Sequence, residues 1–172
     1  MKRGILNMKK GLSVAGMILP FAGALGIAAT DLFFKNKVDK ELDESENKEI
    51  KKGIFLIRKH HNRGAMFNLA QKYPQEVTGV SVFSTVLNFL ALATIAPKRG
   101  RVLEKAGFSL MLGGAISNTY DRVKKKYVMD YVSLDVKPEK VRNIVFNISD
   151  VSLLLGVILV FISNLTAKDR AL

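Results

Sequence analysis

The sequence has no cysteine and only two histidines. Without cysteine the chain forms no disulfide bond and has neither a thiolate nucleophile nor a cysteine-based metal site. The histidines, His60 and His61, are adjacent, and adjacent residues do not share a helix face. The sequence also has no P-loop and no recognisable Ser/His/Asp arrangement. We therefore expect neither a metal site nor a cofactor.

Charge is absent from four long runs, although charged residues make up 24% of the 172 residues and hydrophobic residues 48%. The charge-free runs are residues 11–30, 77–96, 106–120 and 151–166. A hydrocarbon layer about 30 Å thick needs about 20 residues of helix. We therefore predict one domain, residues 1–172, of an all-α membrane protein with four transmembrane helices. The predicted spans lie near residues 11–34, 77–97, 102–122 and 146–166.

Two of the predicted spans have alternatives. The third would place Glu104 and Lys105 in its first turn, where charge is costly inside a membrane. The first follows the basic segment Met1–Lys10 and resembles a secretory signal peptide. Its apolar run is longer than the roughly 7–15 residues of a signal peptide, which favours an uncleaved span.

The net charge of +12 favours an anionic partner. No base-stacking motif or groove-binding module accompanies the basic residues, so we expect membrane lipid headgroups rather than nucleic acid. Four spans place both chain ends on one side of the membrane. Basic residues flank the spans on both sides, so counting them does not decide which side is cytoplasmic.

Polar and ionisable residues cluster at the ends of the predicted spans. If the chain crosses the membrane four times, nine of them meet at the same face: Asp31, Lys35, Asn62, Asn118, Asp121, Arg122, Asp130, Asn147 and Asp150. A charged residue at membrane depth costs about 2.5–3.5 kcal/mol on insertion scales. Their convergence predicts a functional site.

Simpler explanations exist for several of these residues. Asn147 and Asp150 fit a helix N-cap and an acid in the first turn. Asp31 and Lys35 have i, i+4 spacing and can simply pair. Arg122 can extend towards lipid headgroups. Nearby glycines indicate close helix packing in a membrane: Gly113, Gly114 and Gly156.

Two other aspartates are harder to explain in this way. Asp121 follows the third run, and an acid at a helix C-terminus opposes the helix dipole. Asp130 lies between apolar and aromatic neighbours in YVMDYV. If Asp130 and Asp150 meet at the membrane edge, they cannot both ionise at low cost, so one keeps a proton near neutral pH. Such a pair can activate water against a carbonyl group, as in aspartic proteases.

Four motifs, in this order, resemble the signal peptidase II family, the lipoprotein signal peptidases of bacteria. DLFFK (31–35) resembles D-x-x-x-K, and NRGAMF (62–67) resembles N-x-G-A-x-F. GGAISNTYDR (113–122), followed by YVMDYV (127–132), resembles G-G-A-x-G-N-x-x-D-R followed by V-V-D-F. FNISD (146–150), with Gly156 after it, resembles F-N-V-A-D-x-x-x-x-x-G.

This resemblance implies a four-helix membrane aspartic endopeptidase with a small β-rich element from the first long gap over its site. It implies removal of the signal peptide from diacylglyceryl-modified prolipoproteins, just before the lipidated cysteine. Asp130 and Asp150 align with the catalytic pair. Substrate binding is implied for Asn62, Asn118, Arg122 and Asn147, and a supporting role for Asp31, Lys35, Gly64 and Asp121. The family also implies a bacterial cell membrane protein, a monomer, with cytoplasmic termini and its site facing outward.

Three positions depart from the family pattern. Ser117 and Lys126 stand where glycine is usual, and Ser149 stands where alanine is usual. We expect Ser149 to add a hydrogen bond to the aspartate pair. Two alternatives to the peptidase are a small membrane transporter or channel lined by the same charged residues, and a non-catalytic relative that binds lipoproteins. The sequence shows no internal repeat or paired broken helices of the kind many transporters have.

Overall fold

The computed structural model describes residues 14–43, 47–50, 54–65 and 69–168. The basic segment Met1–Lys10, on which the signal-peptide alternative depends, lies outside these residues, as do residues 11–13 of the first predicted span and Phe67 of the second motif.

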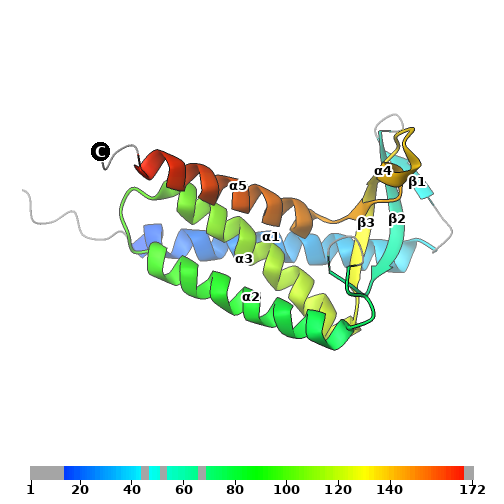
Figure 1. The fold of residues 1–172 in the computed structure, drawn as a ribbon, viewed down its shortest axis with the longest axis horizontal. Helices are drawn as coiled ribbons and strands as arrows, with labels where there is room; N and C mark the ends of the chain where they lie inside the picture. The colour runs from blue at the N-terminus through cyan, green and yellow to red at the C-terminus, as the bar shows by residue number, and fades with distance from the viewer. Residues whose placement is uncertain (1–13, 44–46, 51–53, 66–68, 169–172) are drawn as a thin grey trace, which may run out of the picture.

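Four long helices lie side by side, and a small sheet packs at one end of them (Figure 1). The helices are α1 (Val14–Glu41), α2 (Pro74–Ile95), α3 (Val102–Lys125) and α5 (Ile148–Lys168). At the sheet end, α1 and α3 finish and α2 and α5 begin. The short connection between α2 and α3 lies at the opposite end. This is the alternation that the sequence predicts for the polar residues.

The sheet has four antiparallel strands in the order β1-β2-β3-β4. They are β1 (Asn47–Ile50), β2 (Phe55–Asn62), β3 (Val128–Leu134) and β4 (Val145–Phe146), and the short helix α4 (Glu139–Arg142) lies between the last two. The expected β-rich element is present, but its origin was predicted only in part. Its strands β3 and β4 come from the segment around the end of the third predicted span and the start of the fourth, and β3 carries Asp130.

Within the described residues, three helices, α1, α2 and α5, are long and apolar enough to cross a membrane. Helix α3 is 24 residues long but is not one of these three, because charged residues occupy both of its ends. Large apolar side chains of α2 and α5, such as Phe83 and Phe161, are exposed on the outside of the bundle. Such surfaces are suited to lipid rather than to water.

Helix α3 is the centre of the bundle and packs against α1, α2 and α5. Glycines allow this close approach, as the sequence predicts. A Cβ atom added to Gly114 would lie 2.5 Å from the backbone oxygen of Ser149, and one added to Gly113 would lie 2.7 Å from that of Ala24. Gly156 approaches the backbone oxygen of Gly107 in the same way.

Helix α1 continues seven residues beyond the predicted end of the first span, to Glu41. The charged residues after position 34 resemble a solvated gap in the sequence, but Lys35 and Val38 are buried. Val38 packs with Met129 and Tyr131 of β3. The last turns of α1 therefore pack against the sheet and are not a solvated linker.

Lys126 ends α3 in a left-handed conformation, with φ of 70°. Its backbone N–H donates to the carbonyl oxygen of Arg122, which closes the last turn. A glycine adopts this conformation without steric cost, whereas a lysine does not. This geometry explains why glycine suits this position in the family pattern.

Candidate active site

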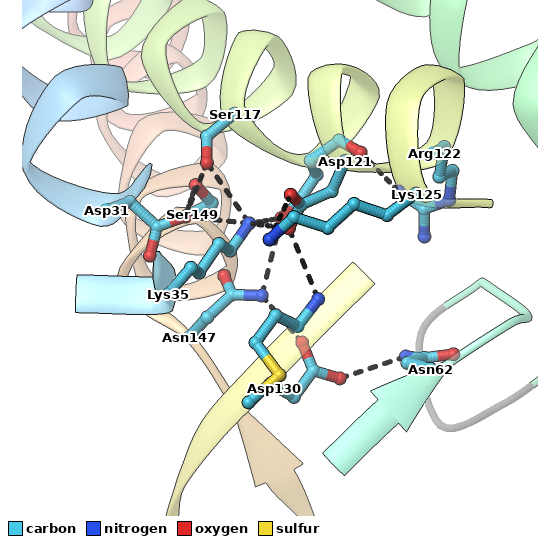
Figure 2. A network of polar contacts seen from close by, with 12 residues as sticks. Asp31, Lys35, Asn62, Ser117, Asp121, Arg122, Lys125, Asp130, Asn147 and Ser149 are labelled. Atoms are coloured by element: carbon cyan, nitrogen blue, oxygen red, sulfur yellow. Dashed lines mark hydrogen bonds and ion pairs between the residues drawn. The ribbon is translucent and has the colours of Figure 1, made fainter. Parts of the chain in front are cut away.

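Asp130 enters the site from β3, with only 2% of its surface exposed. The Nδ2 of Asn147 donates to its Oδ1 at 2.6 Å, and the Nδ2 of Asn62 donates to its Oδ2 at 3.1 Å. Figure 2 shows these two amides reaching the carboxylate from opposite directions. Each oxygen of Asp130 therefore has a fixed donor.

Asp150 lies in the first turn of α5, immediately after β4. The backbone N–H of Asp150 donates to Oδ1 of Asn147 at 2.9 Å, and the backbone N–H of Asn147 donates to Oδ2 of Asp150 at 3.1 Å. This is a reciprocal capping arrangement. It confirms the N-cap prediction for the pair. The remaining oxygen, Oδ1 of Asp150, accepts from Nδ2 of Asn118 at 3.0 Å.

The two aspartates meet around the side chain of Asn147. Its Oδ1 caps the backbone at Asp150, while its Nδ2 reaches Asp130 and lies 3.3 Å from Oδ1 of Asn118. Asn147 therefore contacts both carboxyl groups, that of Asp130 through its side-chain amide and that of Asp150 through its backbone N–H. The N-cap and the contact with Asp130 are compatible, because the same side chain makes both.

Asp130 has an unusual proton affinity. Burial, reinforced by the negative charge of Asp150, raises its pKa from 3.8 to about 7. The hydrogen bonds from Asn62 and Asn147 and the charge of Lys35 oppose this rise without cancelling it. A carboxyl group with such a pKa holds a proton for much of the time at neutral pH, which is the state required of a general acid.

A second group of charges lies behind the aspartate pair. We call Asp31, Lys35, Asp121 and Lys125 the buried ion cluster. Nζ of Lys35 lies 2.9 Å from Oδ2 of Asp31 and 3.3 Å from Oδ2 of Asp121, and all three side chains are fully buried. Lys125 contacts the other oxygen of Asp121 at 3.3 Å. The i, i+4 pairing of Asp31 and Lys35 is confirmed, but it belongs to this larger network.

The buried ion cluster contacts the site at three points. Nζ of Lys35 donates to Oδ1 of Asn118 at 2.7 Å, which leaves the amide nitrogen of Asn118 directed at Asp150. Oδ2 of Asp121 accepts from the backbone N–H of Met129, next to Asp130. Oδ1 of Asp31 accepts from the backbone N–H of Ile148 at the start of α5.

Arg122 approaches the same site from the end of α3. Its Nη2 donates to the carbonyl oxygen of Gly64 at 2.9 Å, and the N–H of Gly64 donates to Oδ1 of Asn62. Arg122 thus holds the loop after β2, rather than only extending towards headgroups. Its Nε is buried and has no hydrogen-bond partner within the described part of the chain.

A cavity of about 820 Å³ opens beside the aspartates, between α2, α3 and α5. Asn118, Arg122 and Asp150 line it, together with apolar side chains such as Val80 and Leu154. The cavity is therefore polar where it meets the site and mainly apolar elsewhere. Within the described ranges, no group of three or more His, Asp or Glu residues is arranged to hold a metal ion.

All ten residues that the sequence singles out lie in or beside this network. One expectation about its details is wrong. Oγ of Ser149 donates to Oδ2 of Asp31 at 2.5 Å and not to the aspartate pair. Tyr131, which was not among the predicted site residues, also belongs to the network, because its hydroxyl donates to Oδ1 of Asp31. The period-two alternation of β3 gives a signal for Tyr131, because it places that side chain on the opposite face from Asp130, towards α1.

Comparisons with known proteins identify relatives of this chain. A family model described as signal peptidase (SPase) II matches residues 14–166. The lipoprotein signal peptidase of Moorella thermoacetica is 31% identical over 136 residues, 79% of this chain and 85% of the relative. That of Bacillus subtilis is 31% identical over 149 residues, 86% and 93% of the two chains.

A solved structure described as a bacterial membrane enzyme has the same fold, with a TM-score of 0.74 and 23% identity over 92% of each chain. The family match covers α1, α2, α3, the sheet and α5 up to residue 166, and it includes both aspartates of the pair. The chain belongs to the signal peptidase II family.

Proposed function

We propose that this protein is an aspartic endopeptidase that removes the signal peptide from diacylglyceryl-modified prolipoproteins, cutting just before the lipidated cysteine. The observation that carries the proposal is the joining of Asp130 and Asp150 by Asn147 at the polar end of a largely apolar cavity. Membership of the signal peptidase II family supports the same substrate class.

In the proposed reaction the two aspartates have different roles. Asp130 holds the proton, in keeping with its raised pKa, and Asp150 is ionised. Asp150 takes a proton from water, the water oxygen bonds to the scissile carbonyl carbon, and Asp130 gives its proton to the carbonyl oxygen. When the resulting gem-diol collapses, the C–N bond breaks, the leaving nitrogen takes the proton from Asp150, and a hydroxyl proton returns to Asp130.

The cavity between α2, α3 and α5 suits a substrate with a lipid anchor. Its apolar walls would take the acyl chains, while the scissile bond lies beside Asp150. Arg122 has a buried Nε without a partner among the described residues, and a substrate carbonyl would satisfy it. Asn118 is held with its amide nitrogen towards Asp150, which places it beside the reacting group. Binding energy from the acyl chains would position the peptide bond.

We further propose a single-domain monomer in the bacterial cell membrane, with α3 as the fourth span. The termini would be cytoplasmic, and the sheet and aspartates would lie at the outer face. Because the chain lacks cysteine, single cysteines placed at Lys98 and Lys140 test this topology. An impermeant maleimide applied to intact cells should label Lys140→Cys and not Lys98→Cys. The reverse pattern would refute the orientation.

Cleavage of a purified, diacylglyceryl-modified precursor tests the activity. We expect the wild type to cut it, and Asp130→Asn and Asp150→Asn to lose about 10²–10⁴-fold in rate while remaining folded. Asp135→Asn is the matched control, because Asp135 follows β3 but pairs with Arg142 at 2.9 Å, outside the site. Normal turnover by either Asn variant of the pair, or binding without cleavage by the wild type, would refute the proposal.

A further inference from the structure

Three hydroxyl groups converge on the buried carboxylate of Asp31. Ser117 and Ser149 donate to its Oδ2 at 2.6 and 2.5 Å, and Tyr131 donates to its Oδ1 at 2.9 Å. Figure 2 shows the two serines directed at Asp31 from different helices. With Lys35 and the N–H of Ile148, five donors serve one carboxylate. Four lone-pair sites are available on a carboxylate, so Asp31 is saturated and fixed.

Each hydroxyl belongs to a residue next to a member of the site. Ser117 precedes Asn118 on α3, Tyr131 follows Asp130 on β3, and Ser149 precedes Asp150 on α5. A bond from the neighbouring residue fixes the backbone from which each site side chain projects. Asp31, on α1, thus contacts all three of the elements that carry Asn118, Asp130 and Asp150.

The family pattern quoted above has glycine, phenylalanine and alanine at these three positions. None of those side chains carries a hydroxyl. This chain therefore has a hydroxyl group at all three positions where the family pattern has none. At position 117 the serine does more than add volume where the family pattern has glycine. Its Oγ donates to Asp31 and accepts from Nζ of Lys35 at 3.1 Å. Nζ of Lys35 in turn donates to Asn118.

We propose that Ser117, Tyr131 and Ser149 are positioning residues that set the separation of the Asp130 and Asp150 carboxyl groups by tethering their backbones to Asp31. All three side chains are buried and none of them lines the cavity, so they act through the residues beside them. This inference rests on the proposed peptidase function. It adds a claim about which groups of this chain control the geometry of its aspartate pair.

The closeness of the two carboxyl groups has a measurable consequence. The charge of Asp150 helps Asp130 to keep its proton, so a wider pair releases that proton at lower pH. The other charged groups near Asp130 are Lys35 on α1 and Arg122 on α3, and His60 on β2 is paired with it in the strand register. The three hydroxyl substitutions remove none of these groups. Ser117→Ala also removes a hydrogen-bond acceptor of Lys35, so the pH profiles of Tyr131→Phe and Ser149→Ala report the separation of the pair most directly.

The test compares Ser117→Ala, Tyr131→Phe, Ser149→Ala and the triple variant on a diacylglyceryl-modified precursor across pH 5–9. We expect the triple variant to lose roughly tenfold to a hundredfold in kcat with little change in KM. We also expect the alkaline limb of its kcat profile to move to lower pH. Each single variant should shift the limb in the same direction by less.

Ser109→Ala is the matched control. Its Oγ donates to the carbonyl oxygen of Pro20 at 2.6 Å, so it removes one buried hydroxyl from the same α1–α3 contact, away from the site. It should lower thermal stability without moving the alkaline limb. If the hydroxyl variants behave like Ser109→Ala, the positioning role is refuted. If the triple variant does not fold, the shift of the alkaline limb in the single variants decides whether the positioning role holds. A wild type without cleavage activity would instead refute the proposed function.

Discussion

Asp130→Asn should stabilise the protein at alkaline pH while it slows cleavage by about 10²–10⁴-fold. The folded protein holds the pKa of Asp130 at about 7, and the usual value is 3.8. Because the pKa is raised on folding, the contribution of Asp130 to stability is fully present below pH 3.8. It is lost as the pH rises through about 7. At about 1.4 kcal/mol per pH unit, the loss reaches about 4 kcal/mol.

Asparagine removes this charge penalty but introduces a different cost. Asp130 accepts hydrogen bonds from both Asn147 and Asn62, and an asparagine at this position has only one oxygen to accept them. One amide would then face another donor, at a cost of about 1–3 kcal/mol. The net gain above pH 7 is therefore about 1–3 kcal/mol. Below pH 5, where the wild-type carboxyl is protonated, the variant should be less stable than the wild type.

Thermal unfolding in detergent at pH 5 and pH 8.5 measures both effects. The variant should have the higher Tm at pH 8.5 and the lower Tm at pH 5, so the difference changes sign between the two. Asp135→Asn, outside the site, should show no such crossover. A constant difference between wild type and variant at the two pH values would mean that the pKa of Asp130 is not raised in the folded protein.

Three further substitutions test the packing around the site. Lys35→Met leaves Asp31 and Asp121 buried with less compensation and should cost about 3–5 kcal/mol; a variant as stable as the wild type in denaturant titration would contradict the role of the ion cluster. Gly114→Ala forces α3 away from the backbone of Ser149 and should lower both Tm and activity, and unchanged activity would show that this contact is not limiting. Lys126→Gly relieves the left-handed backbone and should raise Tm by a few degrees, equivalent to about 1 kcal/mol, with unchanged kcat; a lower Tm would contradict the explanation.

The convergence of these polar residues could be predicted from the sequence because a membrane restricts the arrangement of the chain. Four apolar runs force alternate gaps onto the same face, so residues as distant as Asp31 and Asp150 are brought together by topology alone. The resemblance then separated Asp130 from the other charged residues in the gaps. This convergence does not depend on the rotation of any helix, and the structure brings the residues together; their catalytic and binding roles stay a prediction.

The detailed contacts could not be predicted, because they depend on rotations and bends of less than one helical turn. Ser149 follows the N-cap Asn147 by two residues, and only the packing of α5 against α3 turns it towards Asp31 rather than towards the aspartate pair. The extension of α1 to Glu41 was missed for a related reason. A buried lysine resembles the end of a membrane span until its partners are known.

The charges of the buried ion cluster and of the aspartate pair explain why the pair should hold a single proton in the resting protein. In the buried ion cluster, Asp31 and Asp121 are balanced by Lys35 and Lys125. Two cations of the described residues act on the pair: Lys35, which already belongs to that cluster, and Arg122, which lies within the electrostatic reach of both Asp130 and Asp150. With one shared proton the pair carries a single negative charge, and the site is neutral. Removal of that proton would leave an uncompensated charge in a buried position, which is costly. The form with one acid and one base is therefore also the form that the surrounding charges stabilise.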